Sequence, residues 1–417
     1  MRVFVKSIQG KALMPCTTRK ARILLKQKKA SIIFYNPFTI QLLYATGETT
    51  QKVNIGIDTG AKYVGVAITS QNKVLAKGEI ELRQDVSKNI TTKKIYRRSR
   101  RNRKTRYRKP RFQNRTRIYG WLPPSIQSRI DNQIFWINKF VSLLPKPKII
   151  IEVGKFDTVK MMNPDIIPLN YQQGSLYQYE NTKAYLIARE NNKCQICGKV
   201  YDGNGWHIHH IKQRKDGGSD SVKNLALVHN QCHKDFHKGL VKAKFTKPKQ
   251  YKETTFMNIL RKQIFKRVKC EITYGSYTKV NRNRLMLDKT HYNDAIAISG
   301  IKEIKYNNNL LFIIKQFRKK KRSLHEATAR KGRKTPNSTS KRNSKNSKES
   351  NGFYLNDKVS AFGKIGYITG FTSGGAYIKG INNEYITIPE KTYKQVSFKN
   401  IKFICHNNNW QYIASAG

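Results

Sequence analysis

The sequence predicts an α/β protein in which apolar strands with acidic ends are interrupted by a small metal-binding insertion. Apolar strands that end in Asp58 and Glu152 lie far apart in the chain, and a Cys/His-rich segment separates them from the last apolar helix. Short strands between glycines fill the final 65 residues. The expected architecture is therefore one split α/β domain, an inserted metal-binding domain, a small amino-terminal α+β domain and a small carboxy-terminal β-barrel.

The composition favours a nucleic-acid partner. Lys+Arg number 82 and Asp+Glu 25 among 417 residues, so the formal charge is +57. Self-repulsion on this scale disfavours a compact chain unless a polyanion neutralises it. No apolar run reaches the roughly 18 residues of a membrane span, and the basic segments lack an apolar face, so no membrane partner is expected. The 22 Tyr and 18 Phe residues offer stacking surfaces for unpaired bases.

The cysteines and the first residues indicate the compartment. The amino-terminal segment has no apolar stretch typical of a secretory signal. Cys16, Cys270 and Cys405 are scattered, which is not the pattern of a disulfide framework. We therefore expect a reducing bacterial or archaeal cytoplasm.

The amino-terminal half is expected to contain three segments. Residues 1–52 have strand composition at 3–5, 31–34 and 38–44, with a basic helix at Thr18–Lys28. Residues 53–92 begin with three strands in quick succession, separated by turns near Asp58–Ala61 and Gln71–Asn72. Residues 121–180 are expected to form a helix over Ile126–Leu144, ended by prolines, and then the buried strand Lys148–Val153.

An Arg-rich stretch at 93–120 lies between these segments. No acidic residue occurs from Val86 to Ile130, and Lys93–Arg117 holds 14 Lys/Arg in 25 residues. In a helix these side chains would leave no apolar stripe to bury against protein, so surrounding phosphates would have to stabilise it. A solvated, disordered arm is the alternative. The candidate nucleic-acid-binding residues are Arg97, Arg98, Arg100, Arg101, Arg103, Lys104, Arg106 and Arg108.

The carboxy-terminal half is expected to return to the split domain. Within 246–317 the sequence predicts a helix at Thr254–Val268, a strand at Lys269–Tyr274 and one helix over Arg284–Lys305. Residues 318–352 are basic and poor in apolar side chains, which is typical of a linker or of an arm that orders on nucleic acid. Residues 353–417 are the expected β-barrel.

The Cys/His-rich segment at 181–245 carries the most specific pattern in the chain. Cys194-x2-Cys197 and His229-x2-Cys232 are paired ligands separated by 31 residues, which suits one tetrahedral structural zinc ion. Such an ion would join the ends of a domain too small to hold a core by itself. Chance spacing of buried cysteines is the alternative.

The histidines between and after these pairs resemble the HNH endonuclease motif, a β-hairpin and a helix that hold one metal ion. His233 and His237 are spaced i, i+4, so on a helix both imidazoles project from one face. The resemblance makes His209 the third ligand, His210 the general base that activates water, and Asn224 the residue that holds the loop. Many family members have Asp at the position of His209. A zinc finger without catalysis is the alternative, but it leaves four histidines unexplained.

Asp58 alone is ambiguous, because sugar kinases and chaperone ATPases of the actin type open with a similar strand–Asp–Gly turn. Two later features discriminate: Glu152 ends an apolar strand, and His291 and Asp294 lie at the start of an apolar helix. This set resembles the RuvC version of the ribonuclease H fold. The resemblance implies that Asp58, Glu152 and Asp294 bind two Mg²⁺ ions and that His291 belongs to the catalytic set.

The order of these segments resembles the IscB family, transposon-associated RNA-guided nucleases with RuvC-like and HNH domains. Gly10–Pro15 matches the amino-terminal Pro-Leu-Met-Pro signature, with Ala12 in place of the first Pro. Arg19-x2-Arg22-x-Leu24-Leu25 and Pro37–Leu42 also resemble that domain. Gly56–Gly60 reads Gly-Ile-Asp-Thr-Gly where the family usually has Gly-Ile-Asp-Pro-Gly.

The resemblance implies the function and its partners. A structured guide RNA pairs with double-stranded target DNA, one protein chain per RNA, and the complex is nucleoid-associated when bound to target. The HNH centre cuts the guide-paired strand and the RuvC-like centre cuts the displaced strand, with Mg²⁺ or Mn²⁺ at both centres and a structural Zn²⁺. The Arg-rich stretch is then a bridge helix buried in RNA, and the tail a reader of a short motif beside the target. An unguided DNA endonuclease and a non-cleaving RNA-binding scaffold are the alternatives.

Overall fold

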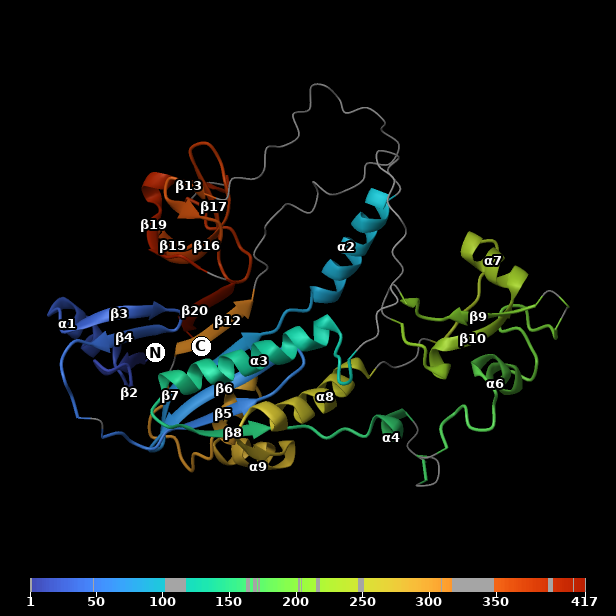
Figure 1. Cartoon of the computed structure of the whole chain (residues 1–417), viewed down its shortest axis with the longest axis horizontal. Helices are drawn as coiled ribbons and strands as arrows, with labels where there is room; N and C mark the ends of the chain where they lie inside the picture. The colour runs from blue at the N-terminus through green and yellow to red at the C-terminus, as the bar shows by residue number, and fades with distance from the viewer. Residues whose placement is uncertain are drawn as a thin grey trace. The chain divides into compact units, whose positions relative to one another are not determined.

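The computed structural model describes residues 2–47, 49–101, 118–162, 166–167, 171, 173–201, 203, 205–214, 218–246, 251–308, 310–316, 349–388, 393–407 and 409–416. The chain forms two units, one made of Met1–Lys155 with Phe256–Gly417 and the other of Phe156–Thr255 (Figure 1). No helix within these described ranges is long and apolar enough to cross a membrane.

The amino-terminal part is an α+β module. Its four-stranded sheet has the order β2-β1-β4-β3, and Ala21 and Leu24 of the helix pack with buried residues of these strands. Thr17 caps the helix by accepting a hydrogen bond from the Lys20 backbone N–H. Strand β2 was not predicted, because it contains Pro15 and alternates only weakly. The elements are β1 (Val3–Lys6), β2 (Ala12–Cys16), α1 (Thr18–Lys26), β3 (Ala30–Tyr35) and β4 (Phe38–Leu42).

A seven-stranded mixed sheet forms the centre of the larger unit, in the order β11-β8-β5-β6-β7-β12-β20. The three strands β5, β6 and β7 are antiparallel neighbours, whereas β8 and β11 add in parallel on the β5 side. On the far side, β12 is parallel to β7 and β20 antiparallel to β12. The strands are β5 (Asn54–Asp58), β6 (Tyr63–Ser70), β7 (Lys73–Glu81), β8 (Lys148–Glu152), β11 (Glu271–Thr273), β12 (Leu310–Gln316) and β20 (Trp410–Ala416).

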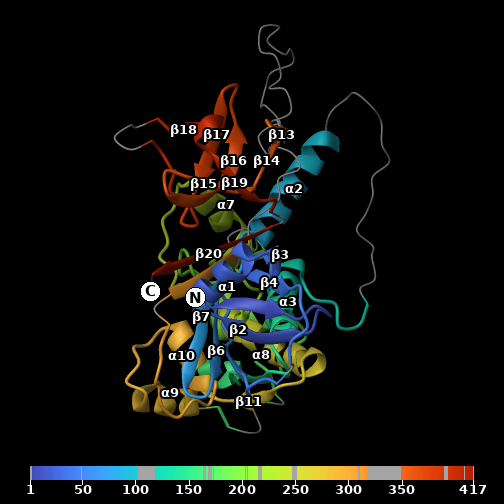
Figure 2. The ribbon, with the colours of Figure 1, turned by 90° about the vertical axis from the view of Figure 1, so that its left-hand side faces the viewer.

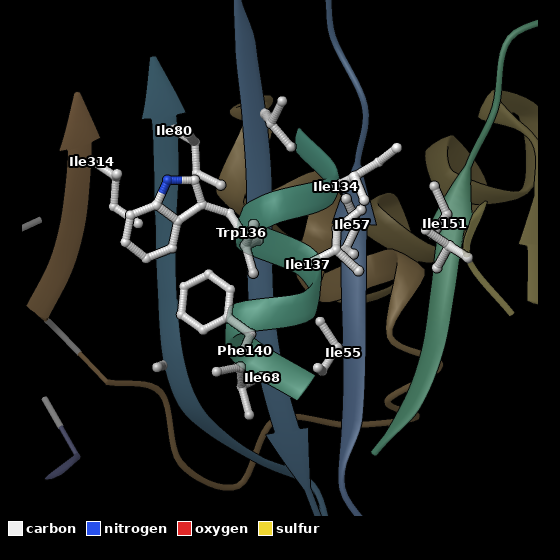
Figure 3. Close-up of a cluster of buried hydrophobic side chains, with 14 of the residues drawn as sticks. Ile55, Ile57, Ile68, Ile80, Ile134, Trp136, Ile137, Phe140, Ile151 and Ile314 are labelled. Atoms are coloured by element: carbon white, nitrogen blue, oxygen red, sulfur yellow. The ribbon is translucent and has the colours of Figure 1, made fainter. Parts of the chain in front are cut away.

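One face of this sheet is covered by α3 (Pro124–Leu143) and α8 (Lys252–Arg267). Trp136 and Phe140 of α3 point toward isoleucines of the strands, as Figure 3 shows. The isoleucines come from alternate strand positions, which places them all on the same face. The core therefore fixes the register that brings the acidic strand ends together.

The opposite face is covered by α10 (His291–Ile298), which lies against β5, β6 and β7 (Figure 2). The single helix predicted over Arg284–Lys305 is wrong: α9 (Gly275–Arg284) ends before it, and α10 begins anew. Met286 has a positive φ of 51°, and the Thr290 side chain caps α10 by accepting from the Asn293 N–H. These two local features interrupt the apolar pattern that favoured one helix.

The tail also differs from the predicted barrel. The described strands form an open five-stranded antiparallel sheet, in the order β18-β17-β16-β15-β19, and a separate β13-β14 pair. The final strand, β20, leaves this sheet and joins the large one. The elements are β13 (Glu349–Ser350), β14 (Phe353–Tyr354), β15 (Lys358–Ala361), β16 (Lys364–Phe371), β17 (Gly375–Lys379), β18 (Gln395–Ser397), η4 (Phe398–Asn400) and β19 (Lys402–Cys405).

The smaller unit is built around the β9–β10 hairpin, with α6 and α7 on opposite sides of it (Figure 1). Leu225 and Leu227 of β10 pack with Leu186 of α6, and the alternate residues Ala226 and Val228 pack with Cys194. The elements are α4 (Thr158–Met162), α6 (Thr182–Arg189), β9 (Trp206–His210), η2 (Val222–Asn224), β10 (Leu225–His229) and α7 (Asn230–Lys238).

Candidate functional site

The first candidate centre lies at the carboxyl ends of β5 and β8. These strands are parallel, and Asp58 is the register partner of Glu152. Both residues follow buried apolar runs, so the strand cores determine where the carboxylates lie. His291 and Asp294 are in the first turn of α10, the helix that packs on the sheet beside these strands. The structure therefore brings together the four residues that the sequence selected for this centre.

Two glycines allow the helix to come this close to the sheet. A Cβ on Gly65 of β6 would lie 1.9 Å from the His291 backbone oxygen. A Cβ on Gly56 of β5 would lie 2.0 Å from the Ala295 backbone oxygen. No other residue type fits at such a short distance. The glycines therefore allow the backbone of α10 to contact the backbones of β5 and β6.

Asp58 and His291 form the closest contact of this centre. The His291 Nδ1 donates to Asp58 Oδ2 at 2.6 Å, and this hydrogen bond raises the pKa of His291. Burial raises the pKa of Asp58 against the lowering effect of the same hydrogen bond. Burial also raises the pKa of Glu152, and the neighbouring charges of Asp58 and Asp294 add to the shift. Three carboxyl groups in mutual repulsion are a suitable environment for divalent cations.

The helix α9 completes the surroundings of the centre. Arg282 makes an ion pair with Asp294 at 2.5 Å, and both side chains are largely buried. A Cβ on Gly275, the first residue of α9, would lie 3.2 Å from Glu152 Oε1. Thr278, one turn later, lowers the pKa of Glu152 through a hydrogen bond. These contacts hold two of the carboxylates in place.

Glu79 is a carboxylate of this centre that the sequence analysis missed. It is paired with Gly65, and Gly65 is paired with Asp58, so the three residues form one row across β7, β6 and β5. Burial raises the pKa of Glu79, with smaller effects from the charges of His291 and Asp58. In the sequence Glu79 and Glu81 are two acids at alternate positions of one strand. Only the pairing of this strand with β6 shows that Glu79, and not Glu81, lies in the row with Asp58.

The second candidate centre is a cluster of imidazoles in the smaller unit. The ligand atoms of His209, His233 and His237 all lie within 4.8 Å of one another. His209 comes from β9, and the other two lie one turn apart on α7, with 3.1 Å between their Nε2 atoms. The spacing i, i+4 therefore places both rings on one face, as the sequence analysis expected.

Burial and neighbouring rings favour the neutral, metal-binding form of His209 and His233. Burial is the main cause that lowers the pKa of His209 to about 4 and that of His233 to about 4, and the other histidines add to it. His207 is a further histidine of the cluster that the sequence analysis did not select. Its ring stacks on His233 with 3.8 Å between the centroids. The strand period of two, which places His207 and His209 on one face, was the available signal.

His210 makes different contacts from those of His209. Its Nε2 donates to Asp220 Oδ1 at 2.8 Å, and Arg214 also contacts this oxygen at 2.8 Å. In a neutral imidazole with a proton on Nε2, the Nδ1 atom is left as the acceptor. Asn224 holds the intervening loop, because its side chain bonds both the N–H and the carbonyl of Lys212 and the carbonyl of Ser219.

The predicted zinc ligands also come together. One donor atom from each of Cys194, Cys197, His229 and Cys232 lies within 4.8 Å of the others. The His229 Nδ1 is 3.5 Å from Cys197 Sγ and 3.9 Å from Cys232 Sγ. Three thiols and one imidazole are a donor set that suits structural Zn²⁺, so the residues present fit the ion.

The Arg-rich stretch is described only in part. Helix α2 (Val86–Arg101) contains Arg97, whose side chain is exposed, and the backbone of Arg98, Arg100 and Arg101. The remaining predicted contacts, Arg103, Lys104, Arg106 and Arg108, lie outside the described residues. No residue of the first turn of α2 is acidic, as the sequence analysis noted for the whole stretch.

Comparison with family models identifies two segments of the chain. Residues 3–174 match the RRXRR protein family, and the sequence at Arg97–Arg101 reads Arg-Arg-Ser-Arg-Arg. Residues 194–239 match the HNH endonuclease family. The smaller unit therefore contains a segment similar to HNH endonuclease domains, and residues 3–174 are similar to RRXRR proteins. No curated protein matches the chain.

Solved structures show weak similarity. Streptococcus thermophilus Cas9 in complex with the AGAA PAM has 15% identity and a TM-score of 0.30, with 42% of this chain and 26% of that chain covered. The same enzyme with the GGAA PAM has 14% identity and a TM-score of 0.30, with 44% and 26% covered. The Type II-C Cas9 from Actinomyces naeslundii has 10% identity and a TM-score of 0.21, with 61% and 60% covered. The chain thus spans about a quarter of the length of the Streptococcus enzyme.

Proposed function

We propose that this protein is an RNA-guided DNA endonuclease of the IscB type, with one RuvC-like and one HNH cutting centre. The observation that carries the proposal is the presence of two chemically different nuclease-type centres in one strongly basic chain. One centre is a set of carboxylates on a sheet, and the other is a set of imidazoles in a domain that matches HNH endonucleases. Two centres suit a substrate with two separated DNA strands.

The RuvC-like assignment of the large sheet rests on its topology and its acids. Asp58 ends the first strand of the sheet, Glu152 ends the fourth, and His291 and Asp294 open the helix that packs on both. Asp58, Glu152 and Asp294 would hold Mg²⁺, which prefers oxygen ligands. When bound, such ions stabilise the attacking and leaving oxygens of a phosphodiester in an in-line displacement. The ion pair between Arg282 and Asp294 would give way to the metal.

At the HNH centre His210 acts as the general base. Asp220 orients its ring through Nε2, so that Nδ1 takes the proton of the attacking water. His209, His233 and His237 would hold the divalent ion that polarises the scissile phosphate. Asn224 keeps the loop between the two strands in position.

The guide RNA accounts for the charge of the chain. A charge of +57 and the exposed basic helix α2 call for a polyanion larger than a short DNA site. In such enzymes base pairing reads the sequence, while the protein reads heteroduplex shape and a short flanking motif. An unguided endonuclease would instead recognise its site by protein contacts alone, and it would be active without RNA.

The carboxy-terminal sheet is proposed to contact the motif beside the target. Lys379 and Lys394 lie over the ring of Tyr385, at 4.4 and 4.9 Å from its centroid, and give this sheet a basic aromatic surface. A structural cap is the alternative. Excision of residues 349–407, with β20 retained, should abolish the preference for a flanking motif. An unchanged preference would favour the cap.

Strand-resolved cutting of end-labelled target by the protein–RNA complex tests the two-centre proposal. We expect Asp58→Ala to cut only the guide-paired strand, because it lacks one carboxylate ligand of the RuvC-like centre. His210→Ala should lose roughly 10²–10⁴-fold of the rate on the guide-paired strand, the range of general-base catalysis, and should still cut the displaced strand. The double variant should bind target normally. Loss of both cuts in Asp58→Ala, with folding and RNA binding intact, would contradict the assignment.

A further inference from the structure

The two proposed nuclease centres differ in the chemistry of their ligands. The centre on the large sheet offers carboxylate oxygens, whereas the HNH cluster consists of His209, His233 and His237. Among the residues that the structure describes, no carboxylate belongs to this cluster. Mg²⁺ binds oxygen ligands and retains several waters, whereas imidazole suits the later first-row transition ions.

The acids near the cluster that belong to the described part of the HNH domain have other partners. Asp220 bonds His210 and Arg214. Asp235 lies on α7 between the two histidines, but both of its oxygens accept from the Gln231 side chain, at 2.9 and 3.1 Å. On a helix, a residue two positions from His233 projects from a different face. Neither carboxylate is therefore placed to complete the imidazole cluster.

The surroundings of His209 are apolar, whereas His237 is exposed and His207 stacks on His233. His209 is only 4% exposed, and the rings of Phe236 and Phe245 lie 5.2 Å from its ring, centroid to centroid. On the His209 side, the site therefore offers no acceptors for the ordered waters of a hydrated Mg²⁺ ion. The 3.1 Å between the Nε2 atoms of His233 and His237 allows both to bind one ion at about 2.0–2.1 Å.

We propose that the His209–His233–His237 centre takes a first-row transition ion in place of Mg²⁺, so that the two DNA strands are cut with different metal requirements. The affinity should rise from Mn²⁺ through Co²⁺ to Ni²⁺, the usual order for nitrogen ligands. This site is separate from the zinc site at Cys194, Cys197, His229 and Cys232, since the two clusters share no residue. The ion class is a property of the ligand set, and its role in cutting rests on the proposed function.

Metal binding by the full-length, zinc-loaded protein tests the proposal without any cutting reaction. Calorimetric titration with Ni²⁺ should show one site that millimolar Mg²⁺ does not displace. His233→Ala should weaken this site at least roughly tenfold. The matched control is His406→Ala, a histidine of the tail that pairs with Asp357 and lies outside the cluster. Ni²⁺ affinity that is equal in both variants, or displacement by Mg²⁺, would overturn the proposal.

The second test separates the metal class from the proposed function. With transition ions removed, the protein–RNA complex in Mg²⁺ should cut only the displaced strand, and micromolar Mn²⁺ or Co²⁺ should restore the other cut. His209→Asp, which supplies a carboxylate, should increase the Mg²⁺-supported rate on the guide-paired strand. Full cutting of that strand in Mg²⁺ alone would contradict the proposed ion class. Absence of both cuts under every metal, with the Ni²⁺ site present, would instead contradict the nuclease mechanism.

Discussion

His291 shows how single residues define the carboxylate centre. Its Nδ1 bonds Asp58, and its backbone rests on Gly65, which separates Asp58 from Glu79 in the row across the sheet. Among the described residues, none makes a hydrogen bond or an ion pair with the Glu79 side chain, whose carboxyl is affected by the charges of His291 and Asp58. This half-buried carboxylate adds negative charge beside the proposed metal ligands.

We therefore predict that Glu79→Gln reduces cutting of the displaced strand by roughly 10–100-fold, because it removes a negative charge close to the proposed Mg²⁺ ligands. The change keeps the shape of the side chain, so thermal stability should stay near that of the parent protein. Glu81→Gln is the matched control, because Glu81 is two residues along the same strand and pairs with Lys315. Equal rates for both variants would assign Glu79 to no role in the centre.

Most residues of both centres could be predicted from local patterns. Asp58 and Glu152 follow apolar strands, and His233 and His237 have helical spacing, so each signal lies within a few residues. Glu79 and His207 could not be found in this way, because their placement depends on strand pairing across the sheet and the hairpin. Arg282 was missed because no element was predicted between Tyr274 and Arg284, where the structure has α9.

At the scale of elements, the contact between α10 and the sheet decides the geometry of the carboxylate centre. The helix is short, and its residues Ala295–Ile298 are buried against β5 and β6. The helix can lie this close to the strands because Gly56 and Gly65, which face it, have no side chains. The sequence predicted a helix here, but the close approach followed only from the glycines on the facing strands.

Gly65→Ala should therefore displace α10 and separate His291 from Asp58. The added Cβ would lie 1.9 Å from a backbone oxygen that cannot move alone. We expect a stability loss of about 1–3 kcal/mol, as for overpacked cores, and loss of displaced-strand cutting. The control Gly174→Ala adds a Cβ with no atom within 4 Å and should change neither property. Unaltered displaced-strand cutting in Gly65→Ala would show that the close approach is dispensable.

The zinc cluster has a corresponding role in the HNH domain. The core of this domain consists of two small groups of apolar residues, one on each side of the hairpin. We predict one tightly bound Zn²⁺ per chain, worth on the order of 10 kcal/mol to the fold of this domain. Cys197→Ser should lose the zinc, make residues 190–240 sensitive to proteases and abolish the HNH cut, while displaced-strand cutting continues. Cys270→Ser, outside the cluster, should retain the metal by elemental analysis; a zinc-free parent protein would contradict the prediction.

At the scale of the whole molecule, the order of segments was predictable but the closure of the sheet was not. The HNH domain was expected as an insertion at 181–245, and the smaller compact unit of the structure is Phe156–Thr255. The pairing of β12 with β20 joins segments that are far apart in the sequence, and no local pattern reports such a contact. Trp410 stacks on Phe135, and Tyr412 packs on Phe312, so β20 belongs to the main core.

The net charge leads to a prediction for the complete molecule. We expect the purified protein to retain a structured RNA, because 82 Lys+Arg against 25 Asp+Glu leave a large excess of positive charge to neutralise. After removal of the RNA in high salt, the protein should cut no duplex at a specific site until the RNA is returned. Absorbance ratios and sequencing of the bound RNA provide the measurement. Specific cutting by RNA-free protein would favour the unguided alternative.

The pairing of β20 with β12 also has a consequence for synthesis on the ribosome. Strand β12 ends at Gln316 and β20 begins at Trp410, so the carboxy-terminal sheet is translated between two strands that are neighbours in the finished protein. Until Tyr412 emerges, Trp136 and Phe312 lack one of their aromatic neighbours, and Lys358 and Tyr367 lack the Tyr412 carbonyl to which both donate. The nascent chain therefore completes its central sheet only after the carboxy-terminal sheet has been made.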